Sequence, residues 1–291
     1  MRGRPRCPEG EQTLSGTPPE LPIVVLDALM PKTQRLVVNR RGSMVWEVES
    51  HRGRYAVKVG YPIEATDDWP AQPWTALAPA REGAVLYRLG FEDFAYGEWV
   101  RGTWNFQPWR DGPDLYELWK PCREPDSRME PHTSVALGCV EALAELHGKG
   151  WAHGDVQPAH FIIGPERTHL IDLALAHGGR VPEGYDFPFR GCLVHYEAPE
   201  IARSVLAAGE AEPTQEADIY ALGASLLISA TGRRVVEYPD DAPRLEQRRA
   251  VASGKRRPVK VDGELGEVID AMLSPAPEDR PTIYEVGKAL S

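Results

Sequence analysis

The amino-acid sequence predicts an α+β protein in which a small β-rich N-lobe is followed by a larger, mainly helical C-lobe. Apolar and polar residues alternate between residues 35 and 59, and later segments repeat apolar residues at helical spacing. The 291 residues, 42% of them hydrophobic, suffice to bury the core of one large domain or two lobes. We expect a disordered tail over residues 1–20 and one domain over 21–291, divided into lobes at about 31–103 and about 104–291.

The N-lobe begins with three short β-rich stretches, "RLVVNRR", "MVWEVES" and "RYAVKVG". Turn-like breaks separate them, so they predict three antiparallel strands in a meander. After a Pro-rich connection, "AREGAVLYRLG" predicts a helix that ends at Gly90, and "DFAYGEWVRG" predicts a strand that ends in a turn.

The C-lobe begins with the segment "TSVALGCVEALAELHGKG", which predicts a helix. Its apolar residues at 136, 137, 140, 143 and 146 form one stripe, closed by Gly148 and Gly150. Short strands, a long loop and helices at about 216–230 and 264–290 complete the lobe.

Charge and composition narrow the class of protein. A net charge of -10 argues against non-specific nucleic-acid binding. No apolar run approaches the roughly 18 residues of a membrane span, and the N-terminus lacks the apolar core of a secretory signal. We therefore expect a cytoplasmic protein without nucleic-acid or membrane partners.

The cysteines (Cys7, Cys122, Cys139 and Cys192) show no CxxC pairing and are interpreted as reduced thiols. Arginine strongly outnumbers lysine, which indicates a GC-rich, bacterial genome.

Lys58 and Glu82 are the first candidate functional residues. Lys58 lies on the third expected strand of an arginine-preferring chain. Glu82 shares the inward face of its helix with Val85, Leu86 and Leu89, at i+3, i+4 and i+7. A carboxylate on that face needs a buried partner, and Lys58 is the natural one.

Strongly polar residues stand between apolar ones in "HGDVQPAHFII" and, a few residues later, in "IDLA". These segments resemble the H-R-D-x-x-x-x-N loop and the D-F-G motif of protein kinases. The first also resembles the H-G-D-x-x-P loop of aminoglycoside and choline phosphotransferases. The resemblance implies that Asp155 accepts the proton of the acceptor hydroxyl and that Asp172 binds metal. It places His160 where the family has its second metal ligand, an asparagine. It further implies that the Lys58–Glu82 pair holds the ATP phosphates.

Three later segments follow the order of the protein kinase motifs. "YEAPE" resembles the A-P-E motif, and "PEDRPT" resembles R-P-T, which implies a pair between Glu200 and Arg280. "EADIYALGASL" resembles the start of the family's central helix, which implies that Asp218 braces the loop that contains His153. We expect His153 to be a structural residue that hydrogen-bonds the loop backbone. The resemblance covers residues 35 to 290 and implies a two-lobed protein-kinase-like fold.

The sequence also departs from the family pattern. Gly42 is the only glycine of "NRRGSMVWEV", where the family has a glycine-rich loop, and we assign ATP binding there to Gly42 and Ser43. The arginine of H-R-D is Gly154, the catalytic-loop lysine is Gln157, and D-F-G has become D-L-A. Residues 173–197, the activation segment, contain no Ser or Thr, so control by phosphorylation is restricted to its tyrosines.

These motifs predict an ATP-dependent phosphotransferase that uses Mg²⁺ or Mn²⁺ and acts on a Ser or Thr hydroxyl of a protein or peptide. Two alternatives remain: a small-molecule phosphotransferase of the aminoglycoside type, and a nucleotide-binding pseudokinase. His160 has three possible interpretations. It binds the metal ion, it packs against the loop as a hydrogen-bond donor that does not touch the ion, or its presence indicates that catalysis is lost. The basic stretch "RRAVASGKRRPVK" at 248–260 predicts either a solvated helix face or a docking site for an acidic substrate.

Overall fold

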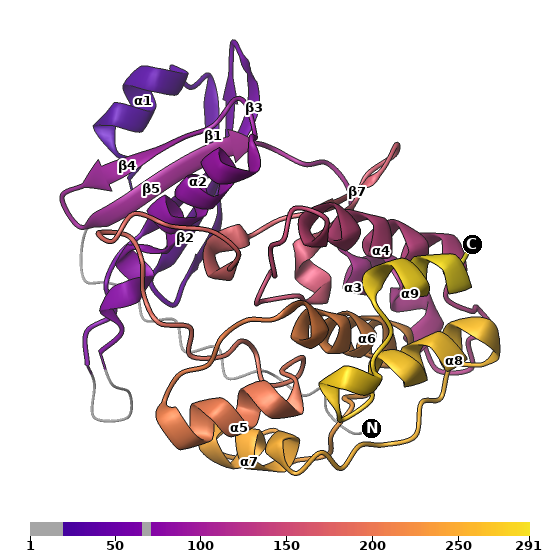
Figure 1. Cartoon of the computed structure of the whole chain (residues 1–291). Coiled ribbons are helices and arrows are strands. Elements are labelled where there is room, and N and C mark those ends of the chain that lie inside the picture. The colour runs from indigo at the N-terminus through magenta and orange to yellow at the C-terminus, as the bar shows by residue number, and fades with distance from the viewer. Residues whose placement is uncertain (1–19, 66–70) are drawn as a thin grey trace. The chain divides into compact units, whose positions relative to one another are not determined.

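The computed structural model describes residues 20–65 and 71–291 and confirms the two-lobed α+β class (Figure 1). The expected disordered tail lies outside the described residues, apart from Glu20. The chain divides into two compact units, Met1–Gly83 with Glu92–Trp109, and Ala84–Phe91 with Arg110–Ser291. The first contains an antiparallel sheet and the second is mainly helical.

The sheet of the N-terminal unit has the strand order β1-β2-β3-β5-β4, and each neighbouring pair is antiparallel. The expected three-stranded meander is confirmed, because β2 pairs along its length with both β1 and β3. The strands are β1 (Thr33–Arg40), β2 (Ser43–Ser50), β3 (Gly53–Gly60), β4 (Ala95–Trp99) and β5 (Gly102–Pro108). The sheet therefore continues beyond residue 103, where we expected the N-lobe to end.

The core of this unit includes a helix that we did not expect, α1 (Ile23–Leu29). Figure 1 shows α1 lying against the sheet, where Val25 and Leu29 are fully buried together with Trp46 and Tyr55. The helix has only two turns, so its apolar residues give too short a stripe to be recognised by periodicity. The other helix, α2 (Ala78–Leu89), ends before Gly90 as expected.

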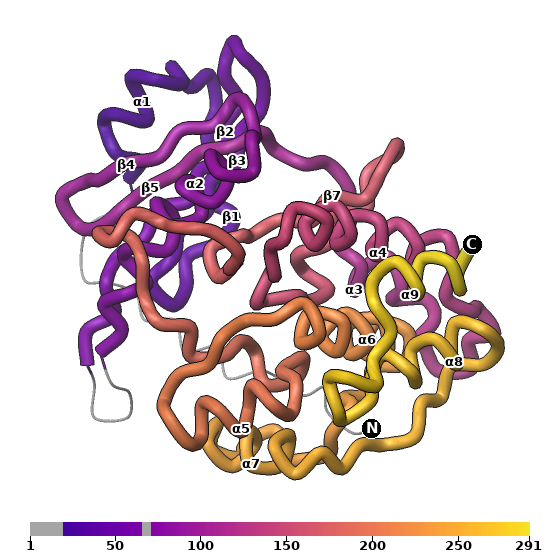
Figure 2. The backbone as a smooth tube through the Cα atoms, viewed as in Figure 1, coloured from indigo at the N-terminus to yellow at the C-terminus, as the bar shows by residue number. Residues whose placement is uncertain are grey.

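Seven helices and a short hairpin are described in the C-terminal unit. Figure 2 traces α6 among α4, α8 and α9, and contacts join α6 to α4 and α8, and α9 to α4 and α8. The elements are α3 (Leu115–Leu118), α4 (Thr133–His147), β6 (Phe161–Ile163), β7 (Thr168–Leu170), α5 (Pro199–Ala208), α6 (Gln215–Thr231), α7 (Arg244–Ala252), α8 (Gly263–Met272) and α9 (Ile283–Ala289).

Helix α6 is the centre of the C-terminal unit, because every residue from Asp218 to Ala230 is buried. Thr214 caps its N-terminus by accepting a hydrogen bond from the Ala217 amide, and Gly232, with φ 69°, ends it. A helix buried on all sides cannot carry an exposed charge, so the carboxylate of Asp218 must find its partners inside the protein.

Arg280 and Glu200 form the ion pair that the motifs imply. Arg280 donates from Nη1 and Nη2 to the two Glu200 carboxylate oxygens, at 2.7 and 2.8 Å. Arg280 also donates to the carbonyls of Ser274 and Glu216, both at 2.8 Å. Its side chain is fully buried, so the pair and these carbonyls satisfy a guanidinium that water does not reach.

A second pair makes Arg248 an exception to the predicted solvated helix face at 248–260, of which Arg249, Lys255 and Lys260 are exposed. Arg248, on α7, is buried and donates to both carboxylate oxygens of Glu197, at 2.6 and 2.7 Å. Gly191 lies against this pair, since a Cβ there would be 2.2 Å from the Glu197 carboxylate. The pair thus ties the activation segment to α7.

Cys122, Cys139 and Cys192 are free thiols; Cys7 lies outside the described residues. Within the described ranges, none of the helices is both long and apolar enough to cross a membrane.

Replacing Glu200 with Ala is expected to lower the free energy of unfolding by about 3 kcal/mol, the lower end for breaking a buried pair. The loss is not larger because Arg280 keeps its carbonyl partners. Chemical denaturation checks this, with Glu145→Ala as control, because the Glu145–Arg167 pair is exposed and contributes about 1 kcal/mol or less. Equal losses in both variants would contradict the structural role.

Candidate active site

The candidate residues fall into two groups, one in each unit. In the N-terminal unit, Lys58 on β3 and Glu82 on α2 form an ion pair, with Nζ 2.8 Å from Oε2. The Glu82 side chain is 1% exposed and that of Lys58 is 13% exposed. Helical spacing therefore places Glu82 inward, as the sequence predicts, and Lys58 is close enough to neutralise it.

Asn105 and Gln107, on β5, also hold Glu82, and neither residue was predicted from the sequence. Asn105 Nδ2 donates to one carboxylate oxygen and Gln107 Nε2 to the other, each at 3.0 Å. The two residues are two positions apart and therefore lie on the same face of β5, and Asn105 lies opposite Lys58 in the sheet. Polar residues at i and i+2 within an apolar strand were the available signal. Glu82 thus has three side-chain donors, which fix its position.

Gly42 and Ser43, assigned to ATP binding from the sequence, lie at the turn between β1 and β2. Arg41 and Gly42 have φ of 51° and 77° and connect the paired residues Arg40 and Ser43. A Cβ on Gly42 would lie 2.5 Å from Thr75 Oγ1. The turn and this packing suffice to explain the glycine, and contact of Gly42 and Ser43 with phosphates stays a prediction.

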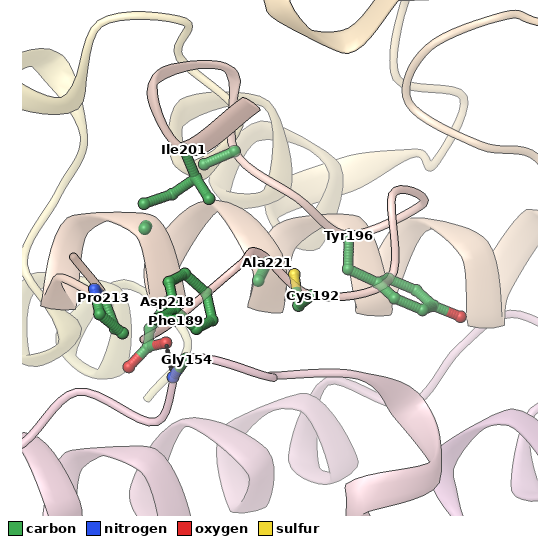
Figure 3. A pocket seen from close by; sticks show the side chains of 10 residues that line it. Gly154, Phe189, Cys192, Tyr196, Ile201, Pro213, Asp218 and Ala221 are labelled. Carbon is green, nitrogen blue, oxygen red and sulfur yellow. Dashed lines mark hydrogen bonds between the residues drawn. The ribbon is translucent and has the colours of Figure 1, made fainter. Parts of the chain in front are cut away.

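In the C-terminal unit, Asp218 organises the catalytic loop, residues 151–160. Its carboxylate accepts hydrogen bonds from the amides of His153, at 2.5 Å, and Gly154, at 2.9 Å. The ring of His147, on α4, lies 3.0 Å from the same carboxylate. Figure 3 shows the carboxylate directly beside Gly154. Helix α6 therefore anchors the loop through a buried negative charge.

Gly154, at the place of the arginine in the family pattern, is closely packed. Its φ is +77°, and a Cβ would lie 2.7 Å from the Leu175 carbonyl oxygen. Any larger residue would need a strained backbone and a shift of the neighbouring chain. A side chain at residue 154 is therefore disfavoured in this backbone, while the Gly154 amide binds Asp218.

His153 connects the loop to the segment before Asp172. Its Nε2 lies 3.0 Å from the Ile171 carbonyl oxygen, which can only accept, so Nε2 carries the proton. Its Nδ1 then accepts from the Asp155 amide, at 3.1 Å. Complete burial lowers the pKa of His153, and the nearby His160 adds to this. A neutral ring with both nitrogens engaged fits the structural role that we expected.

Asp155, His160 and Asp172 lie together. His160 Nδ1 is 2.8 Å from the Asp155 carbonyl oxygen, so this nitrogen is the donor. The other nitrogen, Nε2, is 3.5 Å from the Asp172 carboxylate. A neutral ring would direct a lone pair at a carboxylate, which is repulsive unless a proton or a metal ion lies between them. The His160 ring and the Asp172 carboxylate are thus placed so that a proton or a metal ion could lie between them.

The two carboxylates of this cluster have different surroundings. Gln157, at the place of the family lysine, donates to Asp155 Oδ2 at 3.0 Å and orients the carboxylate. Burial raises the pKa of Asp155; the nearby His160 opposes this shift, and the negative charge of Asp172 adds to it. Asp172 has φ 65° and ψ 66°, left-handed values that cost free energy in a non-glycine residue. Such strain is common where a side chain must be presented for function.

The carboxylate and imidazole groups of the cluster suit a divalent metal ion that has few protein ligands. Among the described residues no group of three or more His, Cys, Asp or Glu side chains could hold a metal ion. Mg²⁺ commonly takes one or two carboxylates and completes its shell with water and substrate phosphate. Asp172 and His160 would hold such an ion, and the imidazole nitrogen would favour Mn²⁺ over Mg²⁺.

A small cavity lies behind the loop, between Gly154 and the activation segment (Figure 3). Phe189, Cys192 and Tyr196 contribute to its lining, together with Ala221 on α6. It leaves about 10 Å³ for the centre of a water-sized sphere, so it holds one water at most. This space is too small for a substrate.

The fold and this cluster together define a kinase-like phosphotransferase class. A family model described as "Protein kinase domain" matches residues 117–289, more than half of the chain. The chain therefore belongs to the protein kinase domain family.

Several curated proteins are similar to this chain. Serine/threonine-protein kinase mos of Patiria pectinifera is 30% identical over 151 residues, 49% of this chain and 39% of that protein. Serine/threonine-protein kinase PkaA of Streptomyces coelicolor is 29% identical over 191 residues, 62% and 32% of the two chains. Mitosis inhibitor protein kinase wee1 of Schizosaccharomyces pombe is 30% identical over 174 residues, 52% and 18%. Each match spans less than half of the relative's length.

Replacing His160 with Asn is expected to change the metal preference. If Nε2 binds the ion, wild-type protein binds ATP more tightly with Mn²⁺ than with Mg²⁺, and His160→Asn reduces this ratio by about tenfold, the scale on which metal-site changes act. Calorimetric titration of ATP with each metal measures the ratio. His177→Asn serves as the control, because His177 is exposed. The same ratio in wild type and His160→Asn would contradict the ligand role.

Proposed function

We propose that the protein transfers the γ-phosphoryl group of ATP to a Ser or Thr hydroxyl of a protein or peptide. The observation that carries the proposal is the cluster of Asp155, His160 and Asp172, held by a loop that Asp218 anchors. The names of two relatives, mos and PkaA, include "serine/threonine-protein kinase", which supports this acceptor class.

Asp155 is the proposed base. Its carboxylate accepts the proton of the acceptor hydroxyl as that oxygen bonds to the γ-phosphorus and the bond to the bridging oxygen of ADP breaks. Gln157 fixes one carboxylate oxygen, which leaves the other for the hydroxyl. The raised pKa makes the carboxylate a better proton acceptor than an exposed aspartate. When bound, the metal ion neutralises phosphate charge.

Lys58 is the proposed phosphate-binding residue, and Glu82 positions it. Because Asn105 and Gln107 satisfy Glu82 as well, the carboxylate keeps its place when Lys58 turns its charge to a phosphate. ATP with Mg²⁺ or Mn²⁺ is therefore the proposed co-substrate.

A nucleotide-binding pseudokinase is the second candidate. The tight two-residue turn at Gly42, packed against Thr75, favours it, because it offers less free backbone for phosphates than a glycine-rich loop.

Incubation with γ-labelled ATP and Ser/Thr peptides, protein mixtures and aminoglycosides tests these candidates. We expect the label on Ser or Thr residues of the peptides or proteins. Label on the aminoglycoside alone indicates a small-molecule phosphotransferase. Nucleotide binding with no transfer under either metal indicates a pseudokinase.

Replacing Asp155 with Asn is expected to reduce turnover by about 10²–10⁴-fold, the usual contribution of a general base. Nucleotide affinity should stay within about twofold of wild type, since the proposed role concerns the acceptor. Single-turnover transfer and equilibrium ATP binding measure the two effects, with the exposed Asp262→Asn as a matched control. Equal losses of binding and turnover would point to another role for Asp155.

Replacing Lys58 with Met is expected to weaken ATP binding, because a charge-assisted contact to phosphate is lost, typically a change of tenfold or more. The matched control Lys32→Met removes an exposed lysine of the same unit and should leave ATP affinity unchanged. Thermal unfolding shows whether each variant is folded. Unchanged ATP affinity in a folded Lys58→Met protein would refute the assignment.

A further inference from the structure

A second cavity of the C-terminal unit is lined by four cations. It lies near the end of α6 and leaves about 160 Å³ for the centre of a water-sized sphere, against about 10–15 Å³ for one water. Its charged lining residues are Arg233, Arg234, Arg257 and Lys260, and the rest of its lining is uncharged. We call it the cationic pocket. Its positive charge is unusual in a chain with a net charge of -10.

Two cations of the cationic pocket have carboxylate partners on the chain. Arg234 pairs with Asp240, and Arg257 pairs with Glu237 at 2.6 Å. Both carboxylates are strongly exposed, at 71% and 77%. Exposed pairs contribute little free energy, so these carboxylates can give way to a more highly charged anion.

The other two cations, Arg233 and Lys260, make no side-chain hydrogen bond or ion pair within the described part of the chain. In addition, Arg234 Nη1 is buried and has no hydrogen-bond partner in residues 20–65 and 71–291. The same guanidinium lies over the Tyr238 ring, 4.3 Å from its centroid, and donates from Nη2 to the Tyr238 carbonyl. Arg233 and Lys260 are exposed. The pocket therefore presents two cations to solvent that no carboxylate of the described chain neutralises.

The end of α6 does not explain these cations. Basic residues often complement the carbonyls at a helix C-terminus. Here the Leu227 carbonyl accepts from Thr231 Oγ1, the Ile228 carbonyl from the Gly232 amide, and the Ser229 carbonyl from Arg123. These three carbonyls are thus satisfied without the four cations of the pocket.

We propose that the cationic pocket binds the phosphate group of a phosphorylated Ser or Thr carried by a protein segment. Phosphate carries a charge of about −1.5 to −2 and several acceptor oxygens, which matches a site with several guanidinium donors better than a single carboxylate does. The inference that a protein carries the phosphate rests on the proposed kinase function. The inference that the pocket binds an anion rests on its four cations alone. The pocket would then recruit a substrate that is already phosphorylated.

The test is a titration of the 291-residue protein, followed by the amide resonances of Thr231 and Arg257. The probes are a capped Ala-phosphoserine-Ala peptide, the same peptide with Glu in place of phosphoserine, and inorganic phosphate. We expect saturable shifts with the phosphopeptide, which binds more tightly than either other probe. The double variant Arg233→Ala/Lys260→Ala should bind it at least about tenfold more weakly, as lost charge-assisted hydrogen bonds predict.

Lys255→Ala is the matched control, because Lys255 is an exposed cation of the same basic stretch that does not line the pocket. It should keep wild-type affinity. Unchanged affinity in the double variant, or equal loss in Lys255→Ala, would overturn the site. Tighter binding of the Glu peptide or of inorganic phosphate would overturn the phosphorylated segment as its ligand.

The outcome separates this inference from the proposed function. Phosphopeptide binding that persists in a protein without kinase activity counts against the proposed function and supports the anion site. Kinase activity in a protein that does not bind the phosphopeptide overturns the inference alone.

Discussion

The buried carboxylate of Asp218 is the constraint on which the candidate site depends. It lies in a helix that is buried on all sides, where an unpaired charge would be very costly. Two loop amides and the His147 ring satisfy it, so the catalytic loop is fixed to α6. From there the contacts continue through His153 to Ile171 and through His160 to the Asp155 backbone. One charge thus sets the positions of both carboxylates proposed to act in phosphoryl transfer.

Three glutamates are held by hydrogen bonds from other elements, as Asp218 is. Glu82, Glu197 and Glu200 each accept hydrogen bonds on both carboxylate oxygens from side chains distant in sequence. Such pairs add little net stability compared with apolar packing, but losing one partner is expensive. They therefore fix where elements meet. Glu197 holds the end of the activation segment, and Glu200 the start of α5, without a phosphate, which is consistent with the absence of Ser and Thr from residues 173–197.

The sequence predicts those parts of the structure that follow from period and motif order. The meander, the helix before Gly90 and the pairs Lys58–Glu82 and Glu200–Arg280 are such cases. The burial of Arg248 within the predicted solvated stretch was not foreseen, because the sequence of charge-rich α7 does not indicate which arginine turns inward until Glu197 is placed beside it. Asn105 and Gln107 were missed for a similar reason, since their partner belongs to another element. The packing of Thr75 against Gly42 was also not predicted, because the two residues are far apart in the sequence and no local pattern relates them.

Amide hydrogen exchange at His153 and Gly154 tests most directly whether Asp218 anchors the catalytic loop. In the unphosphorylated protein without ligand, resolved NMR signals would give the opening free energy of each amide. We expect both amides to open with a free energy close to that of the buried amides of α6, because the carboxylate holds them to that helix. Fast exchange at both amides beside a well-protected α6 would contradict it.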